Sequence, residues 1–236
     1  MRSLGGAAPN LFEAMATPII RFAGQTFEPL PSGALHWPAE RALLVADLHL
    51  EKMSSFAKRG SFLPPYDTTM TLARLAGDIA QTRAETVISL GDSFHRDEGT
   101  TTLLDHDRLQ LDGLTELAQW IWLSGNHDPR PHALGGKCLP HLEHRGLTFT
   151  HHPRRGVVAG HLHPAARVVI NGRSVRRACF VYDSKTMILP AYGSSAGNIN
   201  ILSAPFAALF DWSDLEVTML GRGRLYPVSR KRLVEF

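Results

Sequence analysis

"LLVADLHL", residues 43–50, is an apolar run that ends in an aspartate and a histidine. An unbroken apolar run of this length, rich in branched residues, is typical of a buried β-strand. A carboxylate and an imidazole at the end of such a strand can bind a metal ion or move protons. In extended chain, residues i and i+2 point to the same side, so we expect Asp47 and His49 to face the same place.

The same kind of ending recurs along the chain. Apolar runs stop at aspartate, asparagine or histidine in VISLGDSFH (87–95), WIWLSGNHD (120–128), LTFTHHP (147–153) and VVAGHLHP (157–164). Ligands of open α/β sheets bind beyond the carboxyl ends of the strands. The sequence therefore predicts that these endings meet in one site.

Strand and helix patterns alternate before Pro164, which indicates βαβ units and a mainly parallel sheet. Strands are expected over 19–22, 34–36, 42–45, 86–90 and 120–123. Helices are expected from Asp67 or Thr68 as the cap, with apolar positions 72, 75, 76 and 79 on one face, and over 103–118. After Pro164, short strands separated by turns are expected over 167–170, 174–181, 187–189, 208–210 and 216–220, mostly antiparallel. The predicted fold class is α/β, a pair of mixed sheets with helices outside, in a single domain over residues 18–236.

Composition sets broad limits on this chain. Its 236 residues, with 44% hydrophobic and 20% charged residues, are ordinary for a soluble globular protein. It has no apolar run of about 18 residues, so no transmembrane helix is expected. Residues 1–17 lack the apolar core of a signal peptide and are expected to be a disordered lead, with Met15 as an alternative start. Cys138 and Cys179 form no CxxC pair, and we interpret both as reduced packing residues of a cytoplasmic protein. A net charge of +3 is compatible with nucleic-acid binding but does not demonstrate it.

Neighbouring residues in extended chain point apart, which divides roles between them. Asn126 can offer its amide oxygen to a metal ion while His127 faces the substrate. Only one of His151 and His152 is expected to be a ligand. We favour His151, which continues the alternation of apolar residues along 147–151.

The resulting candidate ligands are carboxylate, amide and imidazole groups: Asp47, His49, Asp92, Asn126, His151, His161 and His163. They are too many for one tetrahedral ion but suit two ions that share Asp92. Mixed nitrogen and oxygen donors without thiolate favour Mn²⁺, Fe or Zn²⁺ over Ca²⁺. The other histidines, with no partner at a strand end, are interpreted as surface or packing residues: His36, His106, His132, His141 and His144.

The order of motifs DxH, GD, GNHD, H and GHLH, over about residues 42–164, resembles that of the calcineurin-like metallophosphoesterases. The resemblance implies a four-layer α/β/β/α sandwich with a dinuclear metal site at the strand ends. It implies that one ion is held by Asp47, His49, Asp92 and His163. It implies that the other is held by Asp92, Asn126, His151 and His161.

GDSFH (91–95) further resembles the SbcD-type DNA repair nucleases, in which this histidine partners the catalytic histidine. ADLHLEK (46–52), LPPYDT (63–68), RSVRR (173–177) and LPAYG (189–193) resemble the bacterial DNA-ligase-associated metallophosphoesterases of the PdeM type. The first resemblance implies that His95 supports His127, and the second implies that DNA ligase and helicase repair proteins are partners.

The function predicted from these features is a two-metal phosphodiesterase, a nuclease that acts on DNA. His127 would protonate the leaving group and His95 would set its orientation. Arg167, Arg176 and Arg177 are candidates for tracking a phosphate backbone. Two alternatives stay open: a phosphoesterase for nucleotides or small molecules, and a non-catalytic subunit that docks repair proteins. The complete ligand set and His127 speak against the second.

Overall fold

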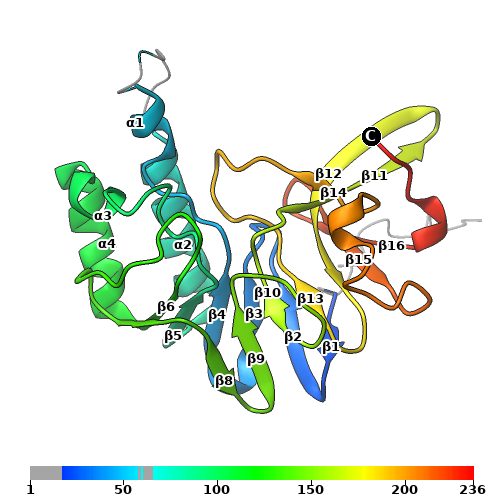
Figure 1. The fold of residues 1–236 in the computed structure, drawn as a ribbon, viewed down its shortest axis with the longest axis horizontal. Helices are drawn as coiled ribbons and strands as arrows, with labels where there is room; N and C mark the ends of the chain where they lie inside the picture. Colours follow the sequence, from blue (N-terminus) through cyan, green and yellow to red (C-terminus); the bar gives the residue numbers. More distant parts are fainter. Residues whose placement is uncertain (1–17, 58–59, 61–65) are drawn as a thin grey trace, which may run out of the picture.

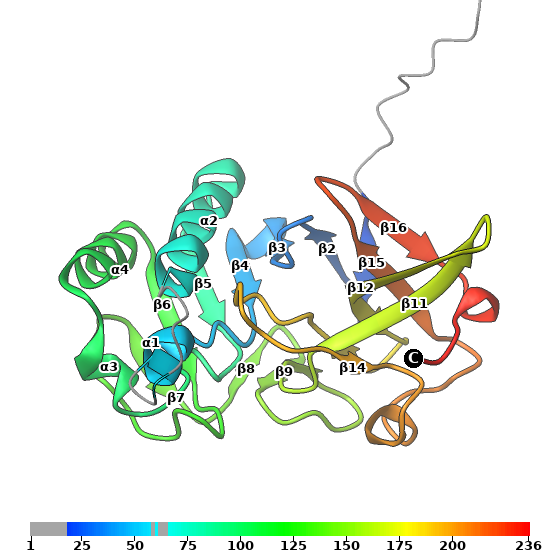
Figure 2. The ribbon, with the colours of Figure 1, turned by 90° about the horizontal axis from the view of Figure 1, so that it is seen from above.

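The computed structural model describes residues 18–57, 60 and 66–236. Figure 1 shows two β-sheets, with the helices α1 to α4 gathered on the outer side of one of them, and Figure 2 shows the same arrangement from above. The expected lead over residues 1–17 lies outside the described residues, so the domain boundary at residue 18 stays a prediction. No helix in the described part of the chain is long and apolar enough to cross a membrane.

The first sheet is seven-stranded over the described residues, with its strands in chain order. These strands are β1 (Ile20–Phe22), β2 (Gln25–Pro29), β3 (Leu35–Trp37), β4 (Ala42–Val45), β5 (Thr86–Ser89), β6 (Gln119–Leu123) and β7 (Lys137–Leu139). From β4 to β7 the strands are parallel, as expected, but β1 to β4 are antiparallel. Short connections explain the difference, because a parallel crossover needs about a dozen residues.

The helices of the described residues are α1 (Lys52–Ala57), α2 (Asp67–Thr82), α3 (Gly99–Thr102) and α4 (Asp105–Leu117), with 3-10 turns η1 (Pro38–Glu40), η2 (Ala204–Phe206) and η3 (Arg230–Arg232). α2 buries Leu72, Leu75 and Ile79 beside the first sheet, as its apolar spacing predicts. Its cap differs from the prediction, because α2 begins after Tyr66 without a side-chain cap. Asp67 instead accepts a hydrogen bond from the Met53 backbone N–H at 3.0 Å, which links α1 to α2.

The second sheet is nine-stranded over the described residues, in the order β14-β11-β12-β13-β10-β9-β8, with β15 and β16 continuing from β12. Its strands are β8 (Leu142–His144), β9 (Leu147–Thr150), β10 (Val158–Ala159), β11 (Pro164–Ile170), β12 (Arg173–Tyr182), β13 (Met187–Ile188), β14 (Ile199–Asn200), β15 (Glu216–Leu220) and β16 (Leu225–Val228). The strand expected over 208–210 is absent. Phe206 and Phe210 instead bury their rings in the cluster that includes Val217 of β15, which holds this segment as a turn.

The layers follow from which side chains are buried together. Leu44 of β4 packs in one cluster with Phe149 of β9 and Phe180 of β12, so the two sheets face each other across an apolar core. The helices form the layer outside the first sheet, and the segment around η2 covers part of the second. The α/β sandwich is therefore as predicted, although the segment that covers the second sheet contains the 3-10 turn η2 rather than an α-helix.

Candidate metal centre

The loops that follow β4 and β5 are joined by backbone hydrogen bonds. The Asp47 N–H donates to the Gly91 carbonyl at 3.2 Å, and the His49 N–H donates to the Asp92 carbonyl at 2.9 Å. Asp47 and His49 have φ values of 54° and 44°, in the left-handed region that non-glycine residues rarely adopt. The side chains of Asp47 and His49 therefore point to the site because of this left-handed backbone. They do not do so because residues i and i+2 of an extended strand point to the same side.

Asp47, His49 and His163 form the first cluster of potential ligands. Nε2 of His163 lies 3.2 Å from Nε2 of His49 and 3.4 Å from Oδ1 of Asp47. Nδ1 of His163 lies 3.1 Å from the Gly197 carbonyl, so the ring donates its proton there. In a neutral ring, the lone pair on Nε2 then points toward a carboxylate, an arrangement that a cation between the two groups would stabilise.

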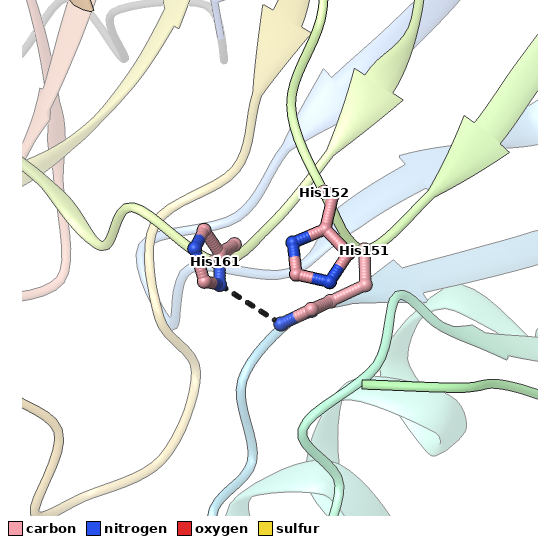
Figure 3. Close-up of side chains that lie close together, drawn as sticks. All are labelled: His151, His152 and His161. Atoms are coloured by element: carbon pink, nitrogen blue, oxygen red, sulfur yellow. Dashed lines mark hydrogen bonds between the residues drawn. The ribbon is translucent and has the colours of Figure 1, made fainter. Parts of the chain in front are cut away.

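His151 is the centre of the second cluster. Its Nδ1 lies 2.9 Å from the Leu90 carbonyl and donates to it, which leaves a lone pair on Nε2 of the neutral ring. That Nε2 lies 2.9 Å from Oδ1 of Asn126, 3.0 Å from Nδ1 of His161 and 3.4 Å from Oδ1 of Asp92. Figure 3 shows the rings of His151 and His161 meeting at these nitrogens. Because electron-rich atoms converge here, the residues present fit a bound cation.

Asp92 lies between the two clusters. Its Oδ1 is 3.4 Å from Nε2 of His151, and its Oδ2 is 3.9 Å from Nε2 of His49. Burial acts to raise the pKa of Asp92, but a protonated His151, through its hydrogen bond and charge, and the His127 backbone N–H outweigh it and hold the pKa well below its usual range. The carboxylate therefore stays charged and lies within reach of both clusters, and its predicted bridging of two ions stays a prediction.

Two motif glycines allow this close packing. A Cβ at Gly125 would overlap Oδ1 and the backbone nitrogen of Asp92. Gly91 has φ of 84°, and a Cβ there would lie 2.6 Å from Cβ of His151. The glycines in GD and GN thus bring the loops after β5 and β6 together at the site.

His127 lies at the open side of the cluster, with its side chain 39% exposed. Its backbone N–H donates to Oδ1 of Asp92 at 2.9 Å, and its Nδ1 donates to the His95 carbonyl at 3.0 Å. The His95 and His127 rings are stacked, with centroids 5.1 Å apart and planes 22° apart. His95 is therefore placed to orient His127 through its carbonyl and by stacking, and Nε2 of His127 is directed toward the site, 3.9 Å from Oδ2 of Asp92.

Asp128 fixes the loops that carry these groups. Its Oδ1 accepts backbone N–H bonds from Asp92 at 3.0 Å and Gly125 at 3.1 Å. Its Oδ2 accepts from Ser93 at 2.8 Å and Phe94 at 3.1 Å. Burial raises the pKa of Asp128 to about 7, against these bonds. The last residue of GNHD thus holds the loops after β5 and β6 together as a structural clamp.

We expect Asp128→Asn to destabilise the fold. An amide offers one acceptor oxygen, so one pair of buried N–H groups would face an NH₂ group. Because each unsatisfied buried donor costs about 1–3 kcal/mol, we expect a loss of at least about 2 kcal/mol in the free energy of unfolding, measured with urea. Asp112→Asn is the control, because Asp112 is half-exposed on α4. A loss no larger than that of the control would contradict the clamp.

His152 is the residue that sequence reasoning did not place at the site. Residues 151 and 152 lie in a bend after β9, so the rule that neighbours in extended chain point apart does not apply. The His152 ring lies 5.0 Å from the His151 ring and 4.8 Å from the His161 ring, centroid to centroid. Figure 3 shows the three rings close together, and one nitrogen from each makes them one of the four potential ligand groups of the described residues. In the sequence, only the pair of adjacent histidines indicated that His152 could also lie at the site.

The remaining candidates lie elsewhere. Arg167 and Arg176 face each other across the β11–β12 hairpin, and both guanidinium groups lie over the Phe236 ring, at 5.9 and 4.8 Å. Arg177 is exposed next to them. The hairpin begins directly after His163, so it leads away from the site. The histidines interpreted as surface or packing residues lie outside the metal-ligand groups found in the described residues.

The fold and site together define a two-sheet α/β sandwich with clusters of histidine and aspartate able to bind metal ions. Among solved structures, the nuclease MPE of Pseudomonas putida is similar to this chain, with a TM-score of 0.66 and 27% sequence identity. The match covers 89% of this chain and 99% of that one. No protein-family model and no curated protein matches the chain.

Proposed function

We propose that this chain is a metallophosphoesterase of the calcineurin-like kind, a two-metal phosphodiesterase that acts as a nuclease on DNA. The observation that carries the proposal is the pair of ligand clusters that share Asp92, with His127 beside them. The similarity to a nuclease over most of both chains supports the choice of a nucleic-acid substrate.

One position would be formed by Asp47, His49, Asp92 and His163, and the other by Asp92, Asn126, His151 and His161. Divalent ions at such positions lower the pKa of water and neutralise charge on a phosphoryl group. The donor set combines imidazole with carboxylate and amide oxygen, which favours Mn²⁺, with Fe or Zn²⁺ as alternatives, over Mg²⁺.

The chain's own residues supply the proton chemistry. His127 donates through Nδ1 to the His95 carbonyl, so its Nε2 is the atom free to serve the substrate. A protonated Nε2 would give its proton to the leaving alkoxide of a diester. The His95 ring, stacked on His127, restricts the rotation of that imidazole without adding negative charge near the phosphate.

The β11–β12 hairpin gives a route for the rest of a long substrate. Arg167, Arg176 and Arg177 would contact phosphates along it, which adds salt-dependent affinity without sequence preference. A role in DNA repair in the cytoplasm, beside a DNA ligase and a helicase, is the part of the proposal that depends on the sequence resemblance alone.

Matched aryl phosphates and labelled DNA test the proposal. With Mn²⁺, we expect hydrolysis of bis(p-nitrophenyl) phosphate to exceed that of p-nitrophenyl phosphate, and we expect cleavage of single- or double-stranded DNA. A diester carries one fewer negative oxygen than a monoester, so the site has less phosphoryl charge to neutralise. The alkoxide that leaves from DNA, unlike p-nitrophenolate, also needs a proton. Mg²⁺ is expected to support less activity, and a chelator is expected to abolish it.

The same assay separates the alternatives. Preference for the monoester, or for nucleotides over DNA, would favour a small-molecule phosphoesterase. Full activity with Mg²⁺ alone would contradict the imidazole-rich site. If the protein binds metal ions but hydrolyses none of these esters, the result would favour the non-catalytic subunit that docks repair proteins.

A further inference from the structure

The three imidazoles of Figure 3, those of His151, His152 and His161, are not used equally by the proposed function. His151 and His161 belong to the second metal position, whereas His152 has no part in it. Yet His152 offers a ring nitrogen within 4.8 Å of nitrogens on both. Its ring is close to perpendicular to theirs, at 70° to His151 and 65° to His161.

We propose that His152 is an additional ligand at the second metal position, so that three imidazoles face that ion. This inference depends on the proposed two-metal site and adds a residue to it. His152 follows β9 in a bend, where the backbone can direct two successive side chains toward His161. It is the exposed member of the three, so it can turn its ring toward an ion without disturbing buried packing.

The two positions would then differ in donor chemistry. The first has two imidazoles, from His49 and His163, beside the carboxylates of Asp47 and Asp92. The second has three imidazoles with Asp92 and the Asn126 amide. Imidazole suits Zn²⁺, Fe and Cu²⁺, whereas carboxylate and carbonyl oxygen suit Mn²⁺ and Mg²⁺. His152 would therefore tighten the second position and bias it toward metals that prefer nitrogen.

Metal titration of the full-length protein tests this without any activity assay. Protein stripped of metal by a chelator is titrated with Co²⁺, followed by visible absorption, and with Mn²⁺, followed by calorimetry. Wild type is expected to bind two ions. For His152→Ala we expect one ion to bind as in wild type and the other about 10-fold or more weakly. We expect the effect to be larger for Co²⁺ than for Mn²⁺.

Two further variants serve as a control and a rescue for His152→Ala. His141→Ala removes an exposed histidine from the segment between β7 and β8 and is expected to leave both ions unchanged. His152→Asp restores a donor and is expected to regain part of the affinity for Mn²⁺. Circular dichroism checks that each variant is folded.

The outcomes distinguish the two proposals. If wild type binds two ions and His152→Ala binds both equally tightly, His152 is no ligand and the two-metal site stands. If both ions weaken equally in His152→Ala, the assignment to the second position is wrong. If wild type binds no ion, the proposed function and this inference both fail.

Discussion

Asp92→Asn is expected to remove both metal ions and nearly all phosphodiesterase activity. The substitution keeps the size of the side chain but removes the charge that lies between the two ligand clusters, 3.4 Å from His151 and 3.9 Å from His49. Neutralising phosphoryl charge is worth several kcal/mol in two-metal catalysis, so turnover should fall about 10³-fold or more. Metal analysis of the dialysed protein and diester kinetics with Mn²⁺ measure the two effects.

A matched variant shows whether metal loss is specific to Asp92 or follows the removal of any buried carboxylate charge. Asp78 is also buried, but its Oδ2 accepts from the Tyr192 hydroxyl at 2.8 Å, away from the clusters. Asp78→Asn is expected to keep both ions. Two tightly bound ions in Asp92→Asn would show that Asp92 does not bridge, and loss of only one would assign it to a single position.

His127→Ala is expected to keep both ions and to lose about 10²–10⁴ in turnover on DNA, the range for a general acid. The ring is 39% exposed at the open side of the site, so its removal should leave the buried ligands in place. An alkoxide leaving group needs a proton, whereas p-nitrophenolate leaves without one. We therefore expect a much smaller loss on bis(p-nitrophenyl) phosphate than on DNA.

The comparison of substrates decides what His127 does. Equal losses on both would mean that the imidazole stabilises phosphoryl charge rather than donating a proton. Loss of a metal ion in His127→Ala would make His127 a ligand. His141→Ala serves again as the control, with turnover expected to match wild type on both substrates.

Much of the architecture was predictable because its signals are local. The strand over 42–45 was predicted at its observed bounds, and the strands before Asp92 and Asn126 within about a residue. These runs are apolar because their residues are buried on both faces of a central parallel sheet. Once the strands are parallel, their carboxyl ends share an edge, so the polar endings were expected to meet, and the structure brings them together.

Other features were not predicted from the apolar pattern of the strands. The antiparallel direction of β1 to β4 depends on how short turns pair the strands. The apolar pattern over 208–210 predicts a strand. The segment is instead a turn, because the Phe210 ring is buried against the second sheet. Asp128 could be identified as a clamp only from the four backbone N–H groups that its carboxylate meets.

The strand positions, the donor types at their ends and the order of those motifs can be predicted from the sequence, because apolar periodicity and side-chain chemistry are properties of short segments. The directions in which those donor side chains point depend instead on the three-dimensional fold. Asp47 and His49 reach the cluster through left-handed backbone, His95 holds His127 by its carbonyl, and His152 turns toward His161 in a bend. Side-chain direction outside regular strands depends on loops held by distant partners, and the packing of two sheets brings those partners together.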